Sequence, residues 1–229
     1  MNTSRQGIYL VLLAATLWGS SGVCAQYLFE SYHFSAGGMT MIRLLAAGLL
    51  LTLLGILQGN HPLAMFRETA TFTRLMIFSV FGTLLVQLSF LITIQKTNAA
   101  TATVLQFLTP VVLVLYTMFS KKTLPGGVIF IAVLTSLAGT VLMATHGNLA
   151  SLQLPLWGLI WGRISAGAAA FNSCYSSTLI RQFGPLPVGV ISILIAGGYL
   201  LPFCLPGLQS RQLDTTGWLA RPQETGVGR

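Results

Sequence analysis

Two arginines stand alone inside long apolar stretches of the 229-residue chain. Arg43 lies in the stretch from about Ala36 to Leu57, and Arg163 lies in the stretch from about Leu156 to Ile180. A charged side chain at the centre of a membrane helix costs at least ~2.5–3.5 kcal/mol on insertion scales, so each guanidinium needs a partner or a route to water. Each lies about 10 Å deep at 1.5 Å per residue. Both therefore either snorkel or pair structurally, or line an outward vestibule that attracts a substrate carboxylate.

Four further side chains with polar groups lie well inside apolar stretches. They are Gln87, Gln106, Asn172 and Tyr175. An amide without a hydrogen-bond partner is costly in apolar surroundings, so we expect each amide to have one. Hydrogen bonds between helices and contacts with a substrate explain these residues about equally well, and both interpretations stay open.

An aromatic residue beside a glycine, and one proline, complete the candidates for a substrate pathway. Trp18 next to Gly19 suits either one wall of a central cavity or close packing of helices. Pro110 removes one backbone hydrogen bond and frees a carbonyl one turn earlier, near Gln106. The sequence therefore predicts a kink at Pro110. That kink acts either as a hinge that exposes a carbonyl to substrate or as simple bending.

The composition indicates which elements position these residues. Hydrophobic residues make up 54% of the chain and charged residues only 7%, against about 25% charged in ordinary soluble domains, which excludes a soluble globular enzyme. About 20 apolar residues of helix span a bilayer. Seven stretches have about this length: residues 7–28, 36–57, 75–94, 99–119, 127–145, 156–180 and 188–208.

These stretches predict an all-α fold, a polytopic membrane bundle of about seven transmembrane helices. They are too long for barrel strands and lack polar alternation, and the short gaps between them are rich in loop-forming residues. With a cytoplasmic N-terminus, outer loops would hold only Lys96, which favours that orientation. The inner side would hold Arg5, Arg67, Arg74, Lys121, Lys122 and Arg181.

Nothing in the sequence indicates an enzyme, a metal site or a cofactor. The motifs HExxH, GxSxG and the Walker loop do not occur, and no carboxylates pair within a stretch. Cys24, Cys174 and Cys204 lie in apolar stretches without CxxC spacing, so we expect neither a disulfide framework nor a zinc site. The formal net charge of +8 lies mostly in the gaps between stretches, where it sets orientation in the lipid bilayer, and nucleic acid is not an expected partner.

An internal repeat relates the two ends of the chain. A shift of 151 residues lays Gly7 on Gly158, Glu30 on Arg181 and Gly38 on Gly189. If the unit holds five helices, an odd number, its second copy is inverted in the membrane, as in many secondary transporters. We expect a complete five-helix repeat over residues 7–147 and the first two helices of a second repeat over 155–208. Residues 209–229 are polar and basic, and we expect a disordered tail on the outer side.

Several short segments resemble one family. They are the Leu-Trp-Gly-Ser-Ser of residues 17–21, the Met-Ile-Arg-Leu of residues 41–44, and the Ala-Ala-Thr-Ala of residues 99–102 that leads to the Leu-Thr-Pro-Val of residues 108–111. Together with the lengths and order of the stretches, they resemble the EamA branch of the drug/metabolite transporter superfamily over about Gly7 to Leu208. The resemblance implies ten helices in two inverted halves, and transport of amino acids, their relatives and other small metabolites. Lys121 and Lys122 stand where many relatives carry an acidic residue.

Two functions follow as expectations. The first is an integral secondary transporter of a small-molecule substrate (amino acids, carboxylates, amines or related compounds) in a bacterial inner membrane. Its second repeat is cut short, so the chain is either active or an inactive truncated form. The alternative is a non-transporting membrane fragment that only associates with other chains. A seven-helix light-driven protein is disfavoured, since residues 188–208 hold no lysine for a retinal Schiff base. The Gly158-to-Gly162 spacing predicts close helix packing first and dimerisation second, so a homodimer also stays open.

Overall fold

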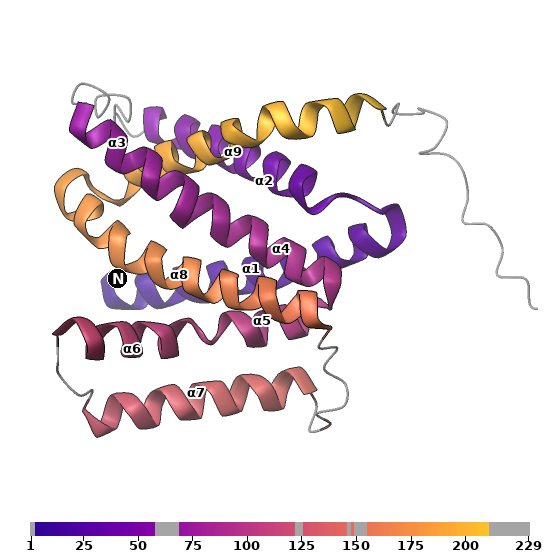
Figure 1. Ribbon diagram of the computed structural model, residues 1–229. Coiled ribbons are helices and arrows are strands. Elements are labelled where there is room, and N and C mark those ends of the chain that lie inside the picture. Colours follow the sequence, from indigo (N-terminus) through magenta and orange to yellow (C-terminus); the bar gives the residue numbers. More distant parts are fainter. Residues whose placement is uncertain (1–2, 58–68, 122–125, 146–147, 149–154, 211–229) are drawn as a thin grey trace, which may run out of the picture.

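The computed structural model describes residues 3–57, 69–121, 126–145, 148 and 155–210. These residues form helices and connecting turns and no strand, which confirms the predicted all-α membrane bundle (Figure 1). The helices in chain order are α1 (Thr3–Tyr32), α2 (Ala36–Leu57), α3 (Thr69–Ile77), η2 (Phe78–Leu84), α4 (Leu85–Lys96), α5 (Ala99–Gln106), α6 (Thr109–Lys121), α7 (Gly127–Thr145), α8 (Leu156–Phe183) and α9 (Pro185–Ser210).

The predicted spans coincide with these helices, with differences at their ends. Five helical segments of the described chain are long and apolar enough to cross a membrane: Gln6–Tyr32, Ala36–Leu57, Phe72–Lys96, Ala99–Phe119 and Pro185–Cys204. Helix α8 has 28 residues but is less apolar, because it carries Arg163 and several serines toward its C-terminus. Residues 211–229 of the expected tail lie outside the described residues.

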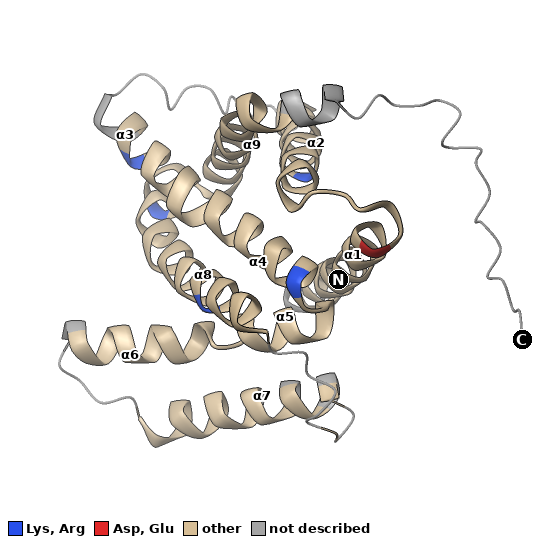
Figure 2. Ribbon diagram, turned by 45° about the vertical axis from the view of Figure 1, so that its right-hand side comes forward, with Lys and Arg blue, Asp and Glu red and all other residues tan. Residues whose placement is uncertain are grey.

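Helices α2 and α9 pack along each other in antiparallel directions (Figures 1 and 2). Three glycines of α2 lie along the contact with α9: Gly37 faces Cys204, Gly48 faces Leu194 and Gly55 faces Leu186. Residue numbers therefore rise along one helix as they fall along the other. Glycine at these positions lets the two backbones approach closely.

The central contacts of this pair are reciprocal. Gly48 of α2 faces Leu194 of α9, and Gly197 of α9 faces Leu45 of α2. Gly48 and Gly197 are 149 residues apart in the chain, as are Leu45 and Leu194. An inverted repeat whose two-fold axis passes between the helices would exchange these contacts. The separation of 149 in this pair is two residues shorter than the predicted shift of 151, and the repeat itself stays a prediction.

Helix α8 packs against α4 and α5 through its glycines. Gly158 faces the side chain of Thr97, and Gly162 faces Leu105 of α5. A side chain at either glycine would collide with these neighbours. The glycine pair therefore serves packing within the chain, the first of its two predicted roles.

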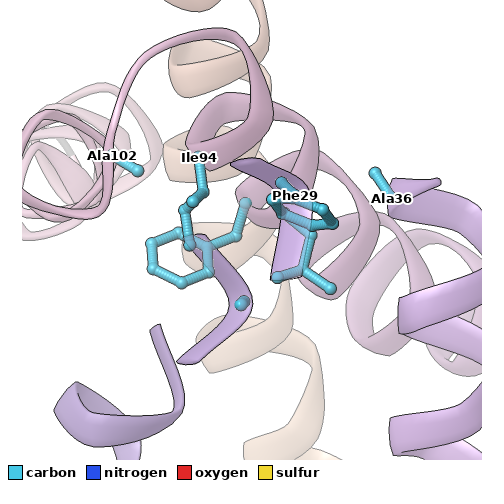
Figure 3. Close-up of a cluster of buried hydrophobic side chains, with 7 residues drawn as sticks. Phe29, Ala36, Ile94 and Ala102 are labelled. Carbon is cyan, nitrogen blue, oxygen red and sulfur yellow. The ribbon is translucent and has the colours of Figure 1, made fainter. Parts of the chain in front are cut away.

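Buried apolar side chains join the four helices α1, α2, α4 and α5. Figure 3 shows Phe29 of α1, Ala36 of α2, Ile94 of α4 and Ala102 of α5 in one cluster. Two further clusters join η2 and its flanking helices to α8 and α9 and to α2. The core thus lies among α2, η2, α4, α8 and α9.

The predicted span 75–94 contains a feature that the sequence did not indicate. Residues Phe78–Leu84 form the π-helix η2 between α3 and α4. π-Helical segments are rare and are frequent at functional sites. Here the wider turn contains Gly82, which lies against Phe78 and Asn172.

The first half of α1 and the helix α7 lie at the outside of the bundle. Every residue from Gln6 to Ser20 is exposed, and so are most of the described side chains of α7. Figure 1 shows α7 below α6, away from α2 and α9. Large apolar side chains that are exposed in this way suit contact with lipid.

Candidate functional site

Arg43 projects from α2 in the half of the helix nearer its N-terminus. It is half-buried, and its Nη1 is buried without a hydrogen-bond partner among the described residues. Among the described residues the one acidic residue is Glu30, which is exposed and accepts a hydrogen bond from Gln26 at 2.8 Å. A buried donor of a charged group without a partner is costly, which makes Arg43 Nη1 a candidate for binding an acceptor from outside the described residues.

Gln87 of α4 lies at a similar depth to Arg43. Ala36 of α2 packs in a cluster with Ile94, and Leu44 packs in another with Leu84, so α2 and α4 are antiparallel and residues 43 and 87 are level. The Oε1 atom of Gln87 is also buried without a hydrogen-bond partner. A free donor and a free acceptor therefore lie in one layer of the bundle.

Asn172 and Tyr175 lie one turn apart on α8 and face η2. The Nδ2 atom of Asn172 lies 3.2 Å from the position that a Cβ at Gly82 would occupy. The Tyr175 ring stacks on Phe171 with centroids 5.1 Å apart, and on Phe78 with centroids 6.2 Å apart. The structure thus brings these two predicted residues together against the π-helix.

Gln106 and Pro110 mark a break in the predicted span 99–119. Helix α5 ends at Gln106 and α6 begins at Thr109, as the prediction of a kink requires. The carbonyl of Gln106, which Pro110 leaves without its backbone donor, accepts a hydrogen bond from Thr109 Oγ1 at 2.6 Å. This carbonyl therefore has a partner within the chain, which favours the bending role over substrate contact.

Trp18 and Gly19 lie on the exposed half of α1. Trp18 is 50% exposed, and a Cβ at Gly19 would meet no atom within 4 Å. The described structure does not bring them together with the other candidates. Their role as one wall of a cavity stays a prediction.

A pocket of about 360 Å³ lies between α6 and α8. Val112 and Tyr116 line it from α6, and residues between Gly167 and Thr178, including Phe171 and Tyr175, line it from α8. Of the predicted candidates it contains only Tyr175. In the part of the chain that the structure describes, no three His, Cys, Asp or Glu side chains are grouped as metal ligands, and the three cysteines are free.

Comparison with known proteins agrees with this architecture. The family model of the EamA-like transporter family matches residues 5–145. The chain belongs to this family. It is also 49% identical over 203 residues to the "Uncharacterized inner membrane transporter YicL" of Salmonella typhimurium, a match that covers 89% of this chain and 68% of that protein. No solved structure matches the chain.

The EamA match ends where α7 ends. It includes Arg43, Gln87 and the Gln106–Pro110 break, whereas Asn172 and Tyr175 lie beyond it on α8. The candidates thus come both from the segment that defines the family and from the helices that follow.

The sequence did not single out Phe171, Tyr116 or η2. Phe171 and Tyr175 are four residues apart, a spacing that puts two rings on one face of a helix, and this pattern could have indicated the aromatic side of the pocket. The π-helix has no comparable signal. Its only unusual residue is Gly82, and single glycines are common in membrane helices.

Proposed function

We propose that this EamA family member is a multi-pass inner-membrane secondary transporter of small metabolites, such as amino acids, carboxylates or amines. The observation that carries the proposal is the pair of unpartnered buried atoms, Arg43 Nη1 and Gln87 Oε1, at one depth of the bundle. Family membership and the likeness to a protein named as an inner membrane transporter support it.

The two side chains suit a substrate that carries a carboxylate and a donor. The Arg43 guanidinium can donate to a carboxylate, and a hydrogen bond to a charged group contributes about 1.5–3 kcal/mol. The Gln87 amide oxygen can accept from an ammonium or a hydroxyl group. An α-amino acid offers both groups a few bonds apart. Its binding would supply the partners that the described chain lacks.

We further propose that the N-terminus is cytoplasmic. Helices α2, α4, α8 and α9 alternate in direction as a chain that crosses the bilayer at each helix requires. With that orientation Ser35 lies outside and Gly184 inside, since one connects α1 to α2 and the other α8 to α9. Alkaline phosphatase fused after Ser35 should be active and a fusion after Gly184 inactive. The reverse pattern would invert the proposed topology.

Rearrangement of the bundle has two bending points available. One is the break between α5 and α6, and the other is η2, where the π-helical turn loosens the regular hydrogen bonding. Both lie in helices that contact α8. We propose that these segments bend while the glycine contacts of α2 with α9 hold.

The proposal can be tested with the purified chain in proteoliposomes. Vesicles are loaded with an equimolar mixture of amino acids, small carboxylates and primary amines, and efflux is followed by mass spectrometry. We expect some solutes to leave faster than from protein-free vesicles. Arg43→Gln should slow the efflux of carboxylate-bearing solutes about tenfold or more, the equivalent of one hydrogen bond to a charged group.

Two variants control this measurement. Arg43→Lys keeps the charge and should retain part of the efflux, because an ammonium still donates to a carboxylate. Arg163 lies seven residues after the start of α8, as Arg43 does in α2, but its side chain is exposed. Arg163→Gln should therefore leave efflux unchanged. Efflux no faster than from empty vesicles for every solute would refute transport by this chain. Equal effects of Arg43→Gln and Arg163→Gln would refute the role of Arg43.

A further inference from the structure

The pocket between α6 and α8 has an aromatic side and a small-residue side. Phe171 and Tyr175 form the aromatic side, while Gly167 and Ala170 leave room next to the rings. Its volume of about 360 Å³ is within the range of about 300–1,000 Å³ that is usual for small-molecule sites. No charged side chain lines it. The space therefore suits a flat, uncharged group better than an ion.

The aromatic side continues beyond the pocket as a row of rings. The Phe171 and Tyr175 planes differ by 25°, and the Tyr175 and Phe78 planes by 10°, so the three rings are nearly parallel. Phe78 is the first residue of η2 and is buried. Packing against the π-helix thus holds the orientation of Tyr175, and Tyr175 in turn stacks on Phe171. Such a pre-oriented surface favours offset stacking with another ring.

The pocket also reaches the depth of the polar pair. Thr97 faces Gly158, and Gly82 lies against Asn172, so α4 and α8 are antiparallel and Gln87 is level with Gly167. Gly167 lines the pocket. The pocket therefore lies at the same level of the bundle as Gln87 and Arg43.

We propose that this pocket binds the aromatic ring of the transported solute, which makes aromatic metabolites with a polar end the preferred substrate class. The inference rests on the proposed function for the statement that the ligand is transported. Binding of a ring in the pocket can be measured without transport. Phe171 and Tyr175 provide the stacking surface, and Tyr116 and Thr178 are the other residues with hydroxyl groups that line the pocket.

Cys174 provides the readout, because it is one of the residues that line the pocket. The full chain with Cys24→Ser and Cys204→Ser, in phosphatidylcholine nanodiscs, leaves Cys174 as the only cysteine. Its rate of labelling by a methanethiosulfonate reagent is measured with 2-naphthol and, separately, with decahydro-2-naphthol, the saturated compound of the same skeleton. A probe at about ten times its Kd leaves about one-tenth of the sites free, so labelling should slow about tenfold with 2-naphthol. The saturated compound should slow it much less.

Matched variants locate the effect. Phe171→Leu and Tyr175→Leu should abolish the protection by 2-naphthol, since they remove the stacking rings. Phe203→Leu removes a ring from the Tyr199–Phe203 pair of α9, which is outside the pocket, and should leave protection unchanged.

Three results would overturn the inference. Equal protection by both probes would indicate a groove for any apolar group, such as an acyl chain. No protection by either probe would show that the pocket does not bind the ring, and a Cys174 that does not react in nanodiscs would show that the pocket is closed. Protection without efflux from proteoliposomes would instead leave the binding site standing and refute the transport function. Efflux without protection would support transport and refute this binding site.

Discussion

Gly48 of α2 and Gly162 of α8 differ from Gly19 of α1 and Gly139 of α7 in what surrounds them. A Cβ at Gly48 would lie 2.6 Å from Leu194, and one at Gly162 would collide with Leu105. At Gly19 and Gly139 no atom lies within 4 Å of that position. The same residue type therefore sets the distance between helices in one region and has no such role in the other. The comparison separates a tightly packed inner region from an outer region that packs loosely.

The candidate site belongs to the inner region. Arg43 lies on α2, Gln87 on α4 and Tyr175 on α8, the helices whose contacts depend on glycine. Side chains hold a binding geometry best when they project from rigid, well-packed elements. Disturbing an inner glycine should thus affect both stability and ligand binding, whereas an outer glycine should affect neither.

The largest expected effect is at Gly162. Gly162→Leu would force a branched side chain into the space of Leu105, and overpacking of this kind typically costs about 1–3 kcal/mol, occasionally more. We expect loss of most monodisperse protein in size-exclusion chromatography and a lower unfolding temperature of what remains.

Gly139→Leu is the matched control for this change. Gly139 is exposed on α7, so leucine there meets no neighbour and removes a poor helix former. Its yield and unfolding temperature should equal or exceed those of the parent chain. If both variants lost the same amount of folded protein, the division into an inner and an outer region would be wrong.

A smaller change in stability is expected for Gly48→Ala. Whether it stabilises or destabilises the protein should depend on the side chain at Leu194. In the parent chain Gly48→Ala places a methyl group 2.6 Å from Leu194 Cδ2, the end of a flexible side chain that can turn away at a cost of about 1 kcal/mol. In a Leu194→Ala background the same methyl group fills empty space and should stabilise. Thermal unfolding of the four proteins of this cycle measures the coupling. Identical effects of Gly48→Ala in both backgrounds would show that this contact does not limit the approach of α2 and α9.

The sequence predicts where helices lie better than which way their residues face. Arg43 and Arg163 each lie seven residues after the start of their helices. Because their expected depths are equal, the sequence predicts the same role for both. In the structure Arg43 is half-buried and Arg163 is exposed. Depth follows from a fixed rise per residue, whereas facing depends on which helices become neighbours, and a single sequence does not contain that information.

The same distinction explains the two irregular segments. The break near Pro110 was predictable because proline lacks the backbone donor and acts locally. The π-helix η2 was not, because it follows from packing of Phe78 and Gly82 against α8 rather than from the residue types within it. The pocket depends on this packing as well, and so only Tyr175 among its residues was a candidate.

The smallest expected effect concerns the hydroxyl groups of two threonines, one in each region. Thr109 Oγ1 donates to the carbonyl of Gln106 at 2.6 Å, and Thr135 Oγ1 on α7 donates to the carbonyl of Ile131 at 2.7 Å. The Gln106 carbonyl cannot receive the usual backbone donor four residues later, because that residue is Pro110. The Ile131 carbonyl lies within a regular helix, where the backbone N–H of residue 135 is its usual donor.

Thr109→Val should therefore leave a carbonyl without a donor in apolar surroundings, while Thr135→Val removes only a second donor. Side-chain hydrogen bonds in membrane proteins contribute about 0.6 kcal/mol on average and up to about 1.7 kcal/mol. We expect a decrease in the unfolding free energy of that size for Thr109→Val and a negligible one for Thr135→Val, measured by thermal unfolding in the same detergent. No decrease for Thr109→Val, or a decrease no larger than that for Thr135→Val, would mean that the hydroxyl bond at the break does not substitute for the donor that proline lacks. In that case the segment between α5 and α6 would be open to water or substrate at the Gln106 carbonyl, and its role in the pathway would be larger than the bending proposed above.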